Sequence, residues 1–599
     1  MTVSPVSPTL TLNQAIFDSR ELLQDLQEQL ATGRKVKTYG DLGVARNQIL
    51  SMRAELSQIK SYKSTISQID VRTDVMLSSL ERLREMVSTT KSDALEVGFA
   101  LQGNGQTVFQ TEVVARFDEV VALLNTNIGD RHLFSGRDIE TAPVRPSVEI
   151  MEGAGVRAGF RQIVSERRQA DLGADGLGRL ALTGPHASVL GAVVATPGDI
   201  GGAAPAQFTI DIGGNAQTFD ISDAGSDTLA ALESAIDTAF GADVASIVGG
   251  NQLRLTAQNP TESITITDVD AGAAALAGLT QGVTTNPTAS VNVTEDVAGS
   301  PFGFKLAGVT TTSAGVTVTP GGPPVNYSVV FNGGTVNDGE HVRVSFNLPD
   351  GTQHDITMVA RASAPLDEDE FLINADPNVM AANFETALNA SIKAEAQQSL
   401  SAASLFAAAT DFFDFDAANP PQRVDGPPFD TATALRNATQ TDTVFWYQGE
   451  DKATAARSSI VGKVDDNIVV GYGARANEDA MVSVMKTFAA VAVETFNPAD
   501  ADAPERYHEL QIRANSGLNF AGSQSVDDIL VEIGVAKTTA GRAEKRHEAT
   551  EILLEDFIVA EEEADIYEVS SAILTLQTRL EASLQVSASL GNLSLVNFL

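Results

Sequence analysis

The sequence predicts a multidomain fold in which N- and C-terminal helices pair in an antiparallel coiled-coil or helical core, with β-rich or α+β modules inserted between them. Three observations predict this arrangement. The chain has 599 residues, too many for one hydrophobic core and enough for about three to four folding units. Apolar residues recur at helical spacing near both ends. In the middle, Gly, Pro, Thr and Asp separate short β-branched runs.

The N-terminal part of the chain carries three helical patterns. The first covers residues 16–30 and stops at Thr32 and Gly33. The second keeps one heptad frame over residues 49–87, and its apolar members are Ile49, Met52, Leu56, Ile59, Ile66, Leu77, Leu80 and Val87. Four polar residues hold other positions of this frame, namely Lys63, Asp70, Thr73 and Arg84. Gly103 and Gly105 break the pattern, and a third pattern runs over residues 113–128.

The C-terminal part also has apolar residues at helical spacing, in patterns over residues 526–560 and 566–580. An intrachain helical bundle satisfies such patterns, and so does one coiled coil that joins the two ends of the chain. The residues that we expect at the assembly seams of the terminal helices are Ile16, Leu23, Leu26, Leu30, Leu56, Ile59, Ile66, Leu80, Ile566, Val569, Ile573, Leu576 and Leu580.

Between the helical ends, residues 147–439 indicate two small modules. In the first, residues 208–212 alternate, Gly213 and Gly214 turn, residues 219–221 form a second strand, and Asp227 is the expected cap of a helix over residues 229–240. Further strands are expected near residues 253–255 and 264–266. The second module has strand patterns at residues 329–331, 342–346 and 356–359 and a helix at residues 380–392. Residues 411–430, rich in proline, are expected to be an exposed connection.

These boundaries predict four domains. Residues 1–145 form the N-terminal helical core, and residues 146–300 form an α+β module whose centre is residues 206–280. Residues 301–439 form a second β-rich or α+β module with a linker, and residues 440–599 form the return segment and the C-terminal helical core.

Composition argues against several classes of function. The formal net charge is −38 and no block of Lys or Arg is present, so neither nucleic-acid binding nor attraction to an anionic membrane is expected. No run is long enough for membrane insertion. The chain contains no cysteine, which excludes disulfides and thiolate chemistry. Residues 1–12 lack the features of a cleaved secretory signal.

The sequence shows no reaction centre, so we expect no enzyme activity, no cofactor and no metal site. Its six histidines form no compact ligand spacing, and His508 and His547 are assigned to solvated helix faces. Residues 268–272 are interpreted as an acidic turn, because the remaining ligands of a calcium loop are missing. The acidic runs at residues 367–370 and 561–563 are expected to lie in water.

Particular segments carry a family resemblance. The segment Leu-Ala-Thr-Gly-Arg-Lys-Val at residues 30–36, followed by Gly40 and Asp41, resembles the turn between the first two conserved helices of the flagellin superfamily. The sequence departs from that family at Leu42, where a second Asp commonly follows. Residues 124–125, the segment Arg-His-Leu-Phe-Ser-Gly at residues 131–136, and Pro143 resemble the place where hook–filament junction proteins leave the helical core.

The C-terminal half adds to the resemblance. The segment Trp-Tyr-Gln-Gly-Glu at residues 446–450, followed by a strand at residues 468–470, resembles the return of junction proteins into the core. Residues 580–586 and the ending Leu-Ser-Leu-Val-Asn-Phe-Leu at residues 593–599 are similar to junction proteins and lack the Leu-Leu-Arg type of tail of filament flagellins. Residues 208–279 are similar to a small insert of long flagellins and of the filament cap.

The resemblance implies an extracellular structural subunit of the bacterial flagellum, exported by the type III route without a cleaved signal peptide. It implies a homo-oligomer, as a ring or a filament, with flagellin, other hook-associated proteins and a cytosolic export chaperone as partners. It implies no cofactor. Within the superfamily, the adaptor between hook and filament is the favoured interpretation. A long filament-forming flagellin is the first alternative, and a flagellar subunit with an enzymatic or adhesive outer domain is the second.

Overall fold

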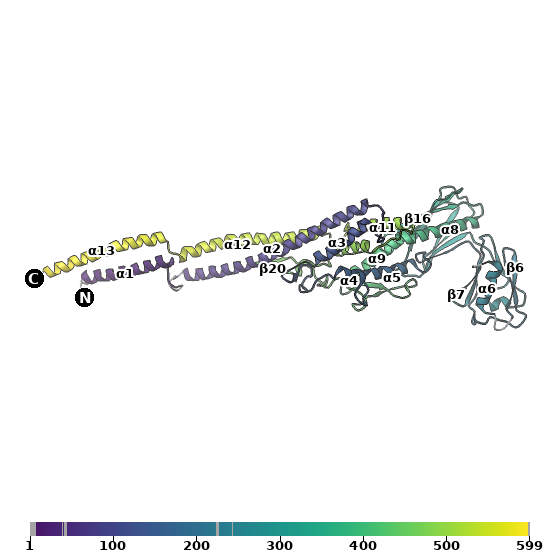
Figure 1. Cartoon of the computed structure of the whole chain (residues 1–599), viewed down its shortest axis with the longest axis horizontal. Coiled ribbons are helices and arrows are strands. Elements are labelled where there is room, and N and C mark those ends of the chain that lie inside the picture. Colours follow the sequence, from purple (N-terminus) through teal and green to yellow (C-terminus); the bar gives the residue numbers. More distant parts are fainter. Residues whose placement is uncertain are drawn as a thin grey trace, which may run out of the picture. The chain divides into compact units, whose positions relative to one another are not determined.

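The computed structural model describes residues 8–38, 40, 43, 45–222, 227–241 and 243–596. It combines helices with mainly antiparallel sheets (Figure 1), so the predicted mixture of helical and β-containing modules is confirmed. The chain forms two compact units. Unit 1 takes its described residues from the ranges Met1–Glu81, Thr454–Ala474 and Asp527–Leu599, and unit 2 comprises Arg82–Ala453 and Arg475–Val526.

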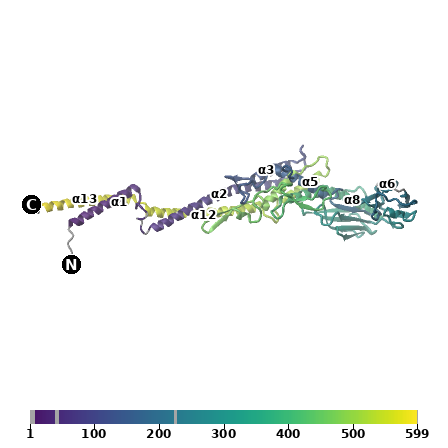
Figure 2. The same cartoon turned by 90° about the horizontal axis from the view of Figure 1, so that it is seen from below.

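Unit 1 is built mainly from four helices, which the sequence predicts. They are α1 (Pro8–Thr32), the first part of α2 (Ala45–Glu96), nearly all of α12 (Val526–Glu562), and α13 (Ile566–Val596). In both views α1 lies beside α13 (Figures 1 and 2). Each helix extends beyond its apolar pattern, because flanking polar residues with good helix propensity continue the backbone without needing a buried face. The hairpin of β20 (Val461–Asp465) and β21 (Ile468–Gly471) completes the unit.

The buried face of α2 departs from the predicted heptad frame. The frame holds from Ile49 to Ile59, but the next buried residue is three positions further on rather than four. Because of this shorter step, every second buried position after Ile59 lies one residue earlier than the heptad frame places it. The helix still keeps one continuous apolar face. The frame positions that are wrong are Lys63, Asp70, Leu77 and Arg84, and the residues buried in their stead are Tyr62, Ile69, Met76 and Leu83.

The helical part of unit 2 contains α3 (Val108–Leu124), α4 (Ser147–Glu152), α5 (Phe160–Leu172), α9 (Ser401–Phe413), α10 (Asp479–Val493) and α11 (Ala503–Gly517). Helix α3 begins at a capping box in which Thr107 and Gln110 satisfy each other's backbone N–H groups. The predicted helix over residues 113–128 ends early, at Leu124, because the chain then turns into the pair β1 (Asn127–Ile128) and β2 (Arg131–His132). Nearly every residue of α10 is buried, so its sequence has no polar face that would reveal a helix.

The two segments that resemble the exit from and the return to a helical core lie side by side. The backbone N–H of Arg145 donates to Trp446 O at 2.9 Å, and that of Gln448 donates to Pro143 O at 2.7 Å. Trp446 is fully buried, and its indole N–H donates to Phe413 O at 2.9 Å. These contacts hold together the two ends of the segment that is inserted between residues 145 and 446. The predicted strand at residues 468–470 is β21.

The insert module within unit 2 matches the predicted order of strands and helix. β5 (Gln207–Ile212) and β6 (Asn215–Asp220) form the hairpin and join β9 (Ile264–Asp268) and β10 (Thr284–Thr285) in one sheet. A second sheet contains β4 (Ser188–Leu190), β7 (Ala245–Val248) and β8 (Gln252–Thr256). Helices α6 (Leu229–Phe240) and α7 (Ala273–Leu276) complete the module. The cap of α6 is Thr228, whose hydroxyl accepts from Ala231 N, and not Asp227 as predicted.

The second module, called the sandwich module below, has two four-stranded sheets and one helix around a common core. One sheet contains β3 (Leu180–Thr183), β11 (Ser290–Glu295), β13 (Val316–Gly321) and β14 (Asn326–Phe331). The other contains β12 (Lys305–Thr311), β15 (His341–Asn347), β16 (Gln353–Arg361) and the parallel strand β17 (Glu370–Leu372). Helix α8 (Pro377–Glu395) contributes Phe384 to the core, where it contacts Phe331 and Phe371. The predicted strands and helix of this module are present.

The expected exposed connection at residues 411–430 is only partly a connection. The π-helical turn η2 (Ala396–Leu400) continues α8 into α9, which buries Phe412 and Phe413. Strand β18 (Gln422–Val424) pairs with β19 (Leu435–Asn437). Arg423 is buried and forms a bidentate ion pair with Glu166 of α5. The prolines mark the turns around this segment, whereas the residues between them pack on the helices.

Candidate functional site

The described surface of unit 1 is the candidate site, because it gathers the predicted seam residues. Between α1 and α13, the buried residues Ala564, Val569 and Ile573 form one cluster with Leu23 and Leu26. The other predicted seam residues divide into three groups. The buried ones are Ile16, Leu56, Ile59, Ile66 and Leu80; the half-buried ones are Leu576 and Leu580; and the exposed ones are Leu30 and Ile566. Their role in assembly stays a prediction.

A ladder of ion pairs joins α2 to α12. Arg53 Nη2 lies 2.5 Å from Glu562 Oε2, Lys60 Nζ lies 3.6 Å from Glu555 Oε1, and Lys63 Nζ lies 2.8 Å from Glu551 Oε2. The step of seven residues from Arg53 to Lys60 on α2 matches a step of seven residues backwards, from Glu562 to Glu555, on α12. The hydrogen bond between Lys63 and Glu551 raises the pKa of the ammonium group and lowers that of the carboxyl group. Exposed pairs of this kind add little stability each, but they select register.

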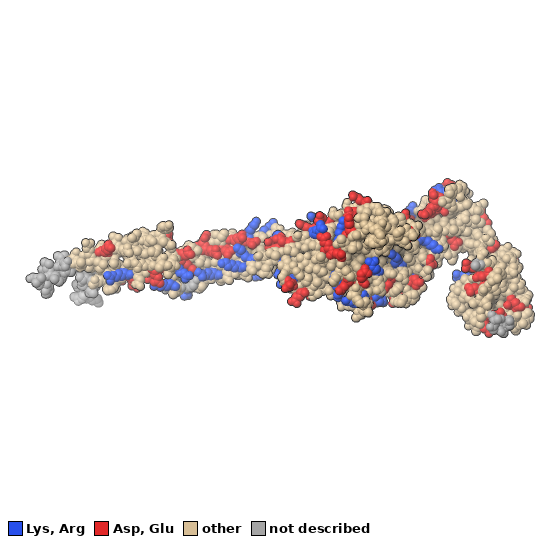
Figure 3. Space-filling view, viewed as in Figure 1, with Lys and Arg blue, Asp and Glu red and all other residues tan. Residues whose placement is uncertain are grey.

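The ladder reflects a larger separation of charge along these helices. Residues 548–563 contain seven Asp and Glu and no Lys or Arg, whereas residues 45–63 of α2 contain four basic residues and one acidic residue. Figure 3 shows the acidic side chains along α12 and the basic side chains along α2. The run at residues 561–563 is therefore not simply solvated as predicted, because Glu562 pairs with Arg53.

The turn after α1, which carries the family-like segment, is bonded to the segment between α12 and α13. Gly33 has φ 70°, a conformation that favours glycine. Its carbonyl accepts from Ala564 N at 2.9 Å, and Lys35 N donates to Glu562 O at 2.8 Å. Lys35 Nζ also reaches Ala560 O at 2.5 Å. The first and last parts of the chain thus share backbone hydrogen bonds. Asp41 and Leu42, which belong to the same family-like segment, lie outside the described residues.

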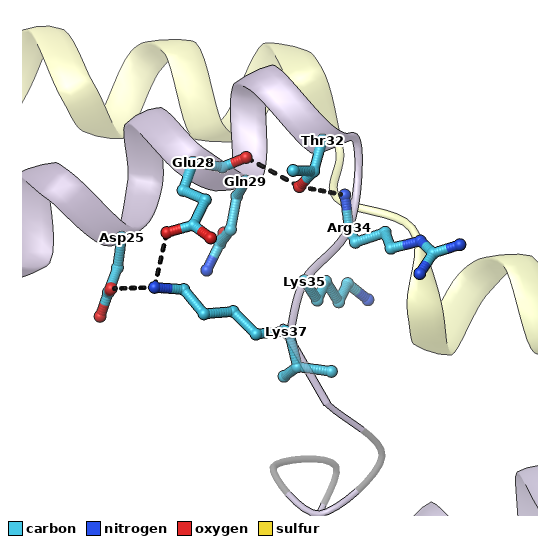
Figure 4. Close-up of a pocket in the computed structure, with 8 residues that line it drawn as sticks. Asp25, Glu28, Gln29, Thr32, Arg34, Lys35 and Lys37 are labelled. Carbon is cyan, nitrogen blue, oxygen red and sulfur yellow. Dashed lines mark hydrogen bonds and ion pairs between the residues drawn. The ribbon is translucent and has the colours of Figure 1, made fainter.

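A cavity of about 380 Å³ lies beside this turn (Figure 4). Lys37 Nζ is 2.5 Å from Glu28 Oε2 and 3.9 Å from Asp25 Oδ1. Thr32 Oγ1 donates to Glu28 O at 2.7 Å and accepts from Arg34 N at 3.4 Å. In Figure 4 the Arg34 side chain extends away from the two carboxylates. These contacts turn the chain out of α1, and the polar side chains at the mouth carry both signs of charge.

The β20–β21 hairpin packs against α2 and α12. His547 is buried, its Nε2 lies 2.8 Å from Val464 O, and its ring stacks on Tyr62 with 5.4 Å between centroids. The assignment of His547 to a solvated face was therefore wrong, because the hairpin that covers it is about 80 residues away in sequence. The Tyr62 hydroxyl donates to Asp466 Oδ1 at 2.8 Å. A side-chain carbon on Gly462 would meet Ile69 Cδ1 at 2.6 Å, so the hairpin lies close to α2.

Large apolar side chains remain exposed on the same helices. A groove of about 510 Å³ between α2 and α12 is lined by Arg53, Leu56, Ser57, Lys60, Glu555, Ile558 and Val559. The exposed apolar residues of α1, α12 and α13 include Phe17, Leu22, Ile552, Leu553, Phe557, Tyr567 and Leu574. These exposed residues were not predicted because they fall outside the seam frame. Their signal in the sequence is that they are apolar at positions off the seam. Such a surface suits contact with further helices.

The acidic and histidine segments elsewhere have structural roles. The Asp268 carboxylate accepts from Gly272 N and Ala274 N, both at 2.8 Å, as expected of an acidic turn. Asp367 and Glu368 are exposed, as expected of the run at residues 367–370, but Glu370 pairs with Arg361 at 2.5 Å and its side chain is largely buried, so the expectation is wrong for Glu370. Among the described residues, no group of three or more His, Asp or Glu is placed to hold a metal ion.

No helix within the described part of the chain is both long and apolar enough to cross a membrane. The last three residues of the family-like tail, 597–599, lie outside the described residues. Comparison of the chain with protein-family models found no match, and comparison with curated proteins found none either.

Proposed function

We propose that the protein is an extracellular structural subunit of the bacterial flagellum, an adaptor of the hook-associated protein 3 type that joins the hook to the filament for motility. The observation that carries the proposal is the pairing of segments from the two ends of the chain, α1 with α13 and α2 with α12, while every other module is inserted between them. A subunit of this design offers a helical surface for assembly.

The same proposal includes the finer architecture. We infer that the paired helices form an antiparallel coiled-coil core. The cluster around Val569 and Ile573 supports pairing of the first and last helices, and the equal seven-residue steps of the ion-pair ladder support the antiparallel register. In the assembled state the partners are further copies in a ring, flagellin on one side and other hook-associated proteins on the other. Export by the type III route, with a cytosolic chaperone, belongs to the same proposal.

The alternative is a long flagellin that forms the bulk of the filament. The exposed apolar residues Ile552, Leu553 and Phe557 on α12 suit a filament as well as a ring, since both need helix–helix contacts between copies. The family-like tail and the Trp446 segment favour the adaptor. The buried position of Trp446 beside residues 143–145 supports this segment as the point of return to the helical core.

Deletion of the gene tests the adaptor role. Because an adaptor acts once, between hook and filament, its loss leaves completed hooks and releases intact flagellin into the medium as unassembled monomer. Antibodies against the inserted modules label one band next to the hook in the wild type, and expression of the full-length chain restores the filament. Labelling along the whole filament, or loss of the filament without release of another flagellin, would establish the bulk-filament alternative instead.

A further inference from the structure

The insert module is joined to the sandwich module by two short segments, called the neck below. The neck consists of residues 184–187, between β3 and β4, and residues 286–289, between β10 and β11. These segments are bonded to each other, since Thr288 N donates to Pro185 O at 3.1 Å. Each module has its own hydrophobic core, and the two cores share none of the described residues. The orientation of one module on the other therefore depends on the neck and on side-chain contacts across it.

One side-chain contact across the neck joins His186 to Glu385. The ring of His186 lies against the insert module, where its Nδ1 is 2.9 Å from Ala257 O. Its other nitrogen, Nε2, is 4.0 Å from Glu385 Oε2 on α8 of the sandwich module, and both side chains are largely buried. The carboxylate also lies next to the neck backbone, because a side-chain carbon on Gly184 would collide with Glu385 Oε2.

The number of protons on His186 decides whether this contact is attractive. Ala257 O can only accept, so the Nδ1 beside it carries a hydrogen. A neutral imidazole has one N–H, and its Nε2 then presents a lone pair to the Glu385 carboxylate. The other neutral tautomer presents its lone pair to Ala257 O instead. Only the doubly protonated ring donates to Ala257 O and attracts Glu385 at the same time.

The proton that closes the contact belongs to the pair rather than to either residue. A proton on the Glu385 carboxyl group would bond to the Nε2 lone pair, just as a proton on Nε2 attracts the carboxylate. The contact is therefore attractive while the pair holds one proton between Nε2 and Glu385. Without that proton, a lone pair and a carboxylate face each other across the neck.

Both modules are acidic, which opposes a closed neck. Residues 188–285 of the insert module contain 11 Asp and Glu and one Arg, and residues 289–395 of the sandwich module contain 13 Asp and Glu and four Lys and Arg. Like charges on neighbouring modules repel. Protonation of His186 places a cation between the two modules, and its loss leaves their repulsion without this opposing charge.

The titration of Glu385 has the same direction. Burial raises the pKa of Glu385 above its ordinary value of 4.5, and the charge of His186 opposes this shift. A carboxyl group with a raised folded-state pKa is held in its protonated form by its buried surroundings, which an open neck would hydrate. This preference for the closed neck is fully present below pH 4.5 and is lost as pH rises through the folded-state value. Both groups therefore favour closure in acidic solution.

We propose that the neck is a proton-operated hinge, closed while His186 and Glu385 share a proton and released when that proton is lost. The hinge lies within unit 2 and does not depend on the proposed flagellar function. Its consequence is that the insert module keeps one orientation on the sandwich module in mildly acidic solution and takes a range of orientations in alkaline solution.

Spin labels test the hinge in the full-length chain, which has no native cysteine to interfere. We place one label by Ala235→Cys on α6 of the insert module and one by Ala307→Cys on β12 of the sandwich module, both exposed positions. Pulsed electron paramagnetic resonance gives the distance distribution at about pH 6 and about pH 9, on either side of the ordinary histidine pKa. We expect one narrow distribution at pH 6 and a broader one at pH 9. A control pair within the sandwich module, Ala307→Cys with the exposed Ala390→Cys on α8, should give the same distribution at both pH values.

Two variants remove the shared proton. Glu385→Gln cannot titrate and offers an amide N–H to the Nε2 lone pair, so its distribution should stay narrow at both pH values. His186→Gln removes the titrating ring and should also show no change with pH, which provides a second test if the first variant fails to fold. His354→Gln is the matched control, because His354 pairs with Glu395 at 3.0 Å within the sandwich module; it should keep the wild-type change.

Four results would overturn the proposal. They are an unchanged wild-type distribution, a change with pH that persists in both Glu385→Gln and His186→Gln, loss of the change in His354→Gln, and an equal change in the control pair of labels.

Discussion

Two adjacent residues of α13 separate subunit folding from subunit assembly. Ile573 is 8% exposed and belongs to the cluster with Leu23 and Leu26, whereas its neighbour Leu574 is 65% exposed. The substitutions Ile573→Asp and Leu574→Asp place the same carboxylate one residue apart. Because successive helical residues point about 100° apart, only the first carboxylate enters the contact between α1 and α13.

The structure sets the expected magnitudes. Burial of an isoleucine side chain contributes about 1.5–3 kcal/mol, and a polar group left in an apolar contact costs about 1–3 kcal/mol more. Ile573→Asp should therefore destabilise the α1–α13 contact by about 3–5 kcal/mol, a large part of the ~5–15 kcal/mol that holds a typical domain. Leu574→Asp should change the stability of the isolated subunit by less than about 0.5 kcal/mol, as is usual for exposed sites.

Hydrogen exchange on the isolated subunit and electron microscopy of assembled material measure the two effects. We expect Ile573→Asp to speed amide exchange in residues 16–32 and 566–576 together, since the two helices share one cluster. Leu574→Asp should leave this exchange at the wild-type rate and yet reduce assembly, because an exposed leucine on the proposed assembly surface is replaced by a charge.

Two results would refute the reasoning. Wild-type exchange in Ile573→Asp would mean that the cluster around Val569 and Ile573 does not hold α1 against α13. Normal assembly of Leu574→Asp would mean that this exposed face of α13 does not contact neighbouring subunits, and the surface would have to be sought elsewhere.

Two further predictions concern the hairpin of unit 1 and the return segment of unit 2. Gly462→Val should lower the free energy of unfolding in urea by about 1–3 kcal/mol, because a Cβ there meets Ile69 Cδ1 at 2.6 Å. Gly534→Val on α12 is the control, because a Cβ there meets nothing within 4 Å. The control should lower this free energy by about 1 kcal/mol or less. Burial acts to raise the pKa of Asp442, but a backbone N–H, a hydroxyl and Arg436 together lower it to about 2. This carboxylate therefore stabilises the fold above its ordinary pKa of 3.8, and that stability is lost as pH falls towards 2. In Asp442→Asn the melting temperature should fall less than in the wild type as pH decreases from 3.8 to about 2. An equal fall in the two proteins would contradict the assignment.

The sequence predicts most elements whose pattern is local. The terminal helices, the hairpin at residues 207–220 and three strands of the sandwich module, β14, β15 and β16, follow from apolar spacing and turn residues, which depend on neighbours in sequence. Helix α10 was not predicted because it is buried on all sides, and α9 was not predicted because it follows α8 without a break.

The candidate site was predictable only in part, because periodicity states that a helix has an apolar face but not which partner covers it. The sequence placed Lys63 at the seam of α2, and the structure gives that place to Tyr62, which stacks on His547 beneath the β20–β21 hairpin. The hairpin is distant in the chain from both residues. Exposed Leu574 and buried Ile573 carry equally apolar side chains, so only their surroundings separate them.

The sequence by itself determined that both ends of this protein are helical, that the middle is built from small β-containing modules, and that charge is divided between residues 45–63 and 548–563. The tertiary structure alone decided which residues of α2 and α12 form ion pairs, the backbone hydrogen bonds between residues 143–145 and residues 446–448, and the stacking of Tyr62 on His547 beneath the β20–β21 hairpin. Local structure follows from spacing along the chain, whereas these contacts join residues that are far apart in sequence and meet only after loop closure has brought them together.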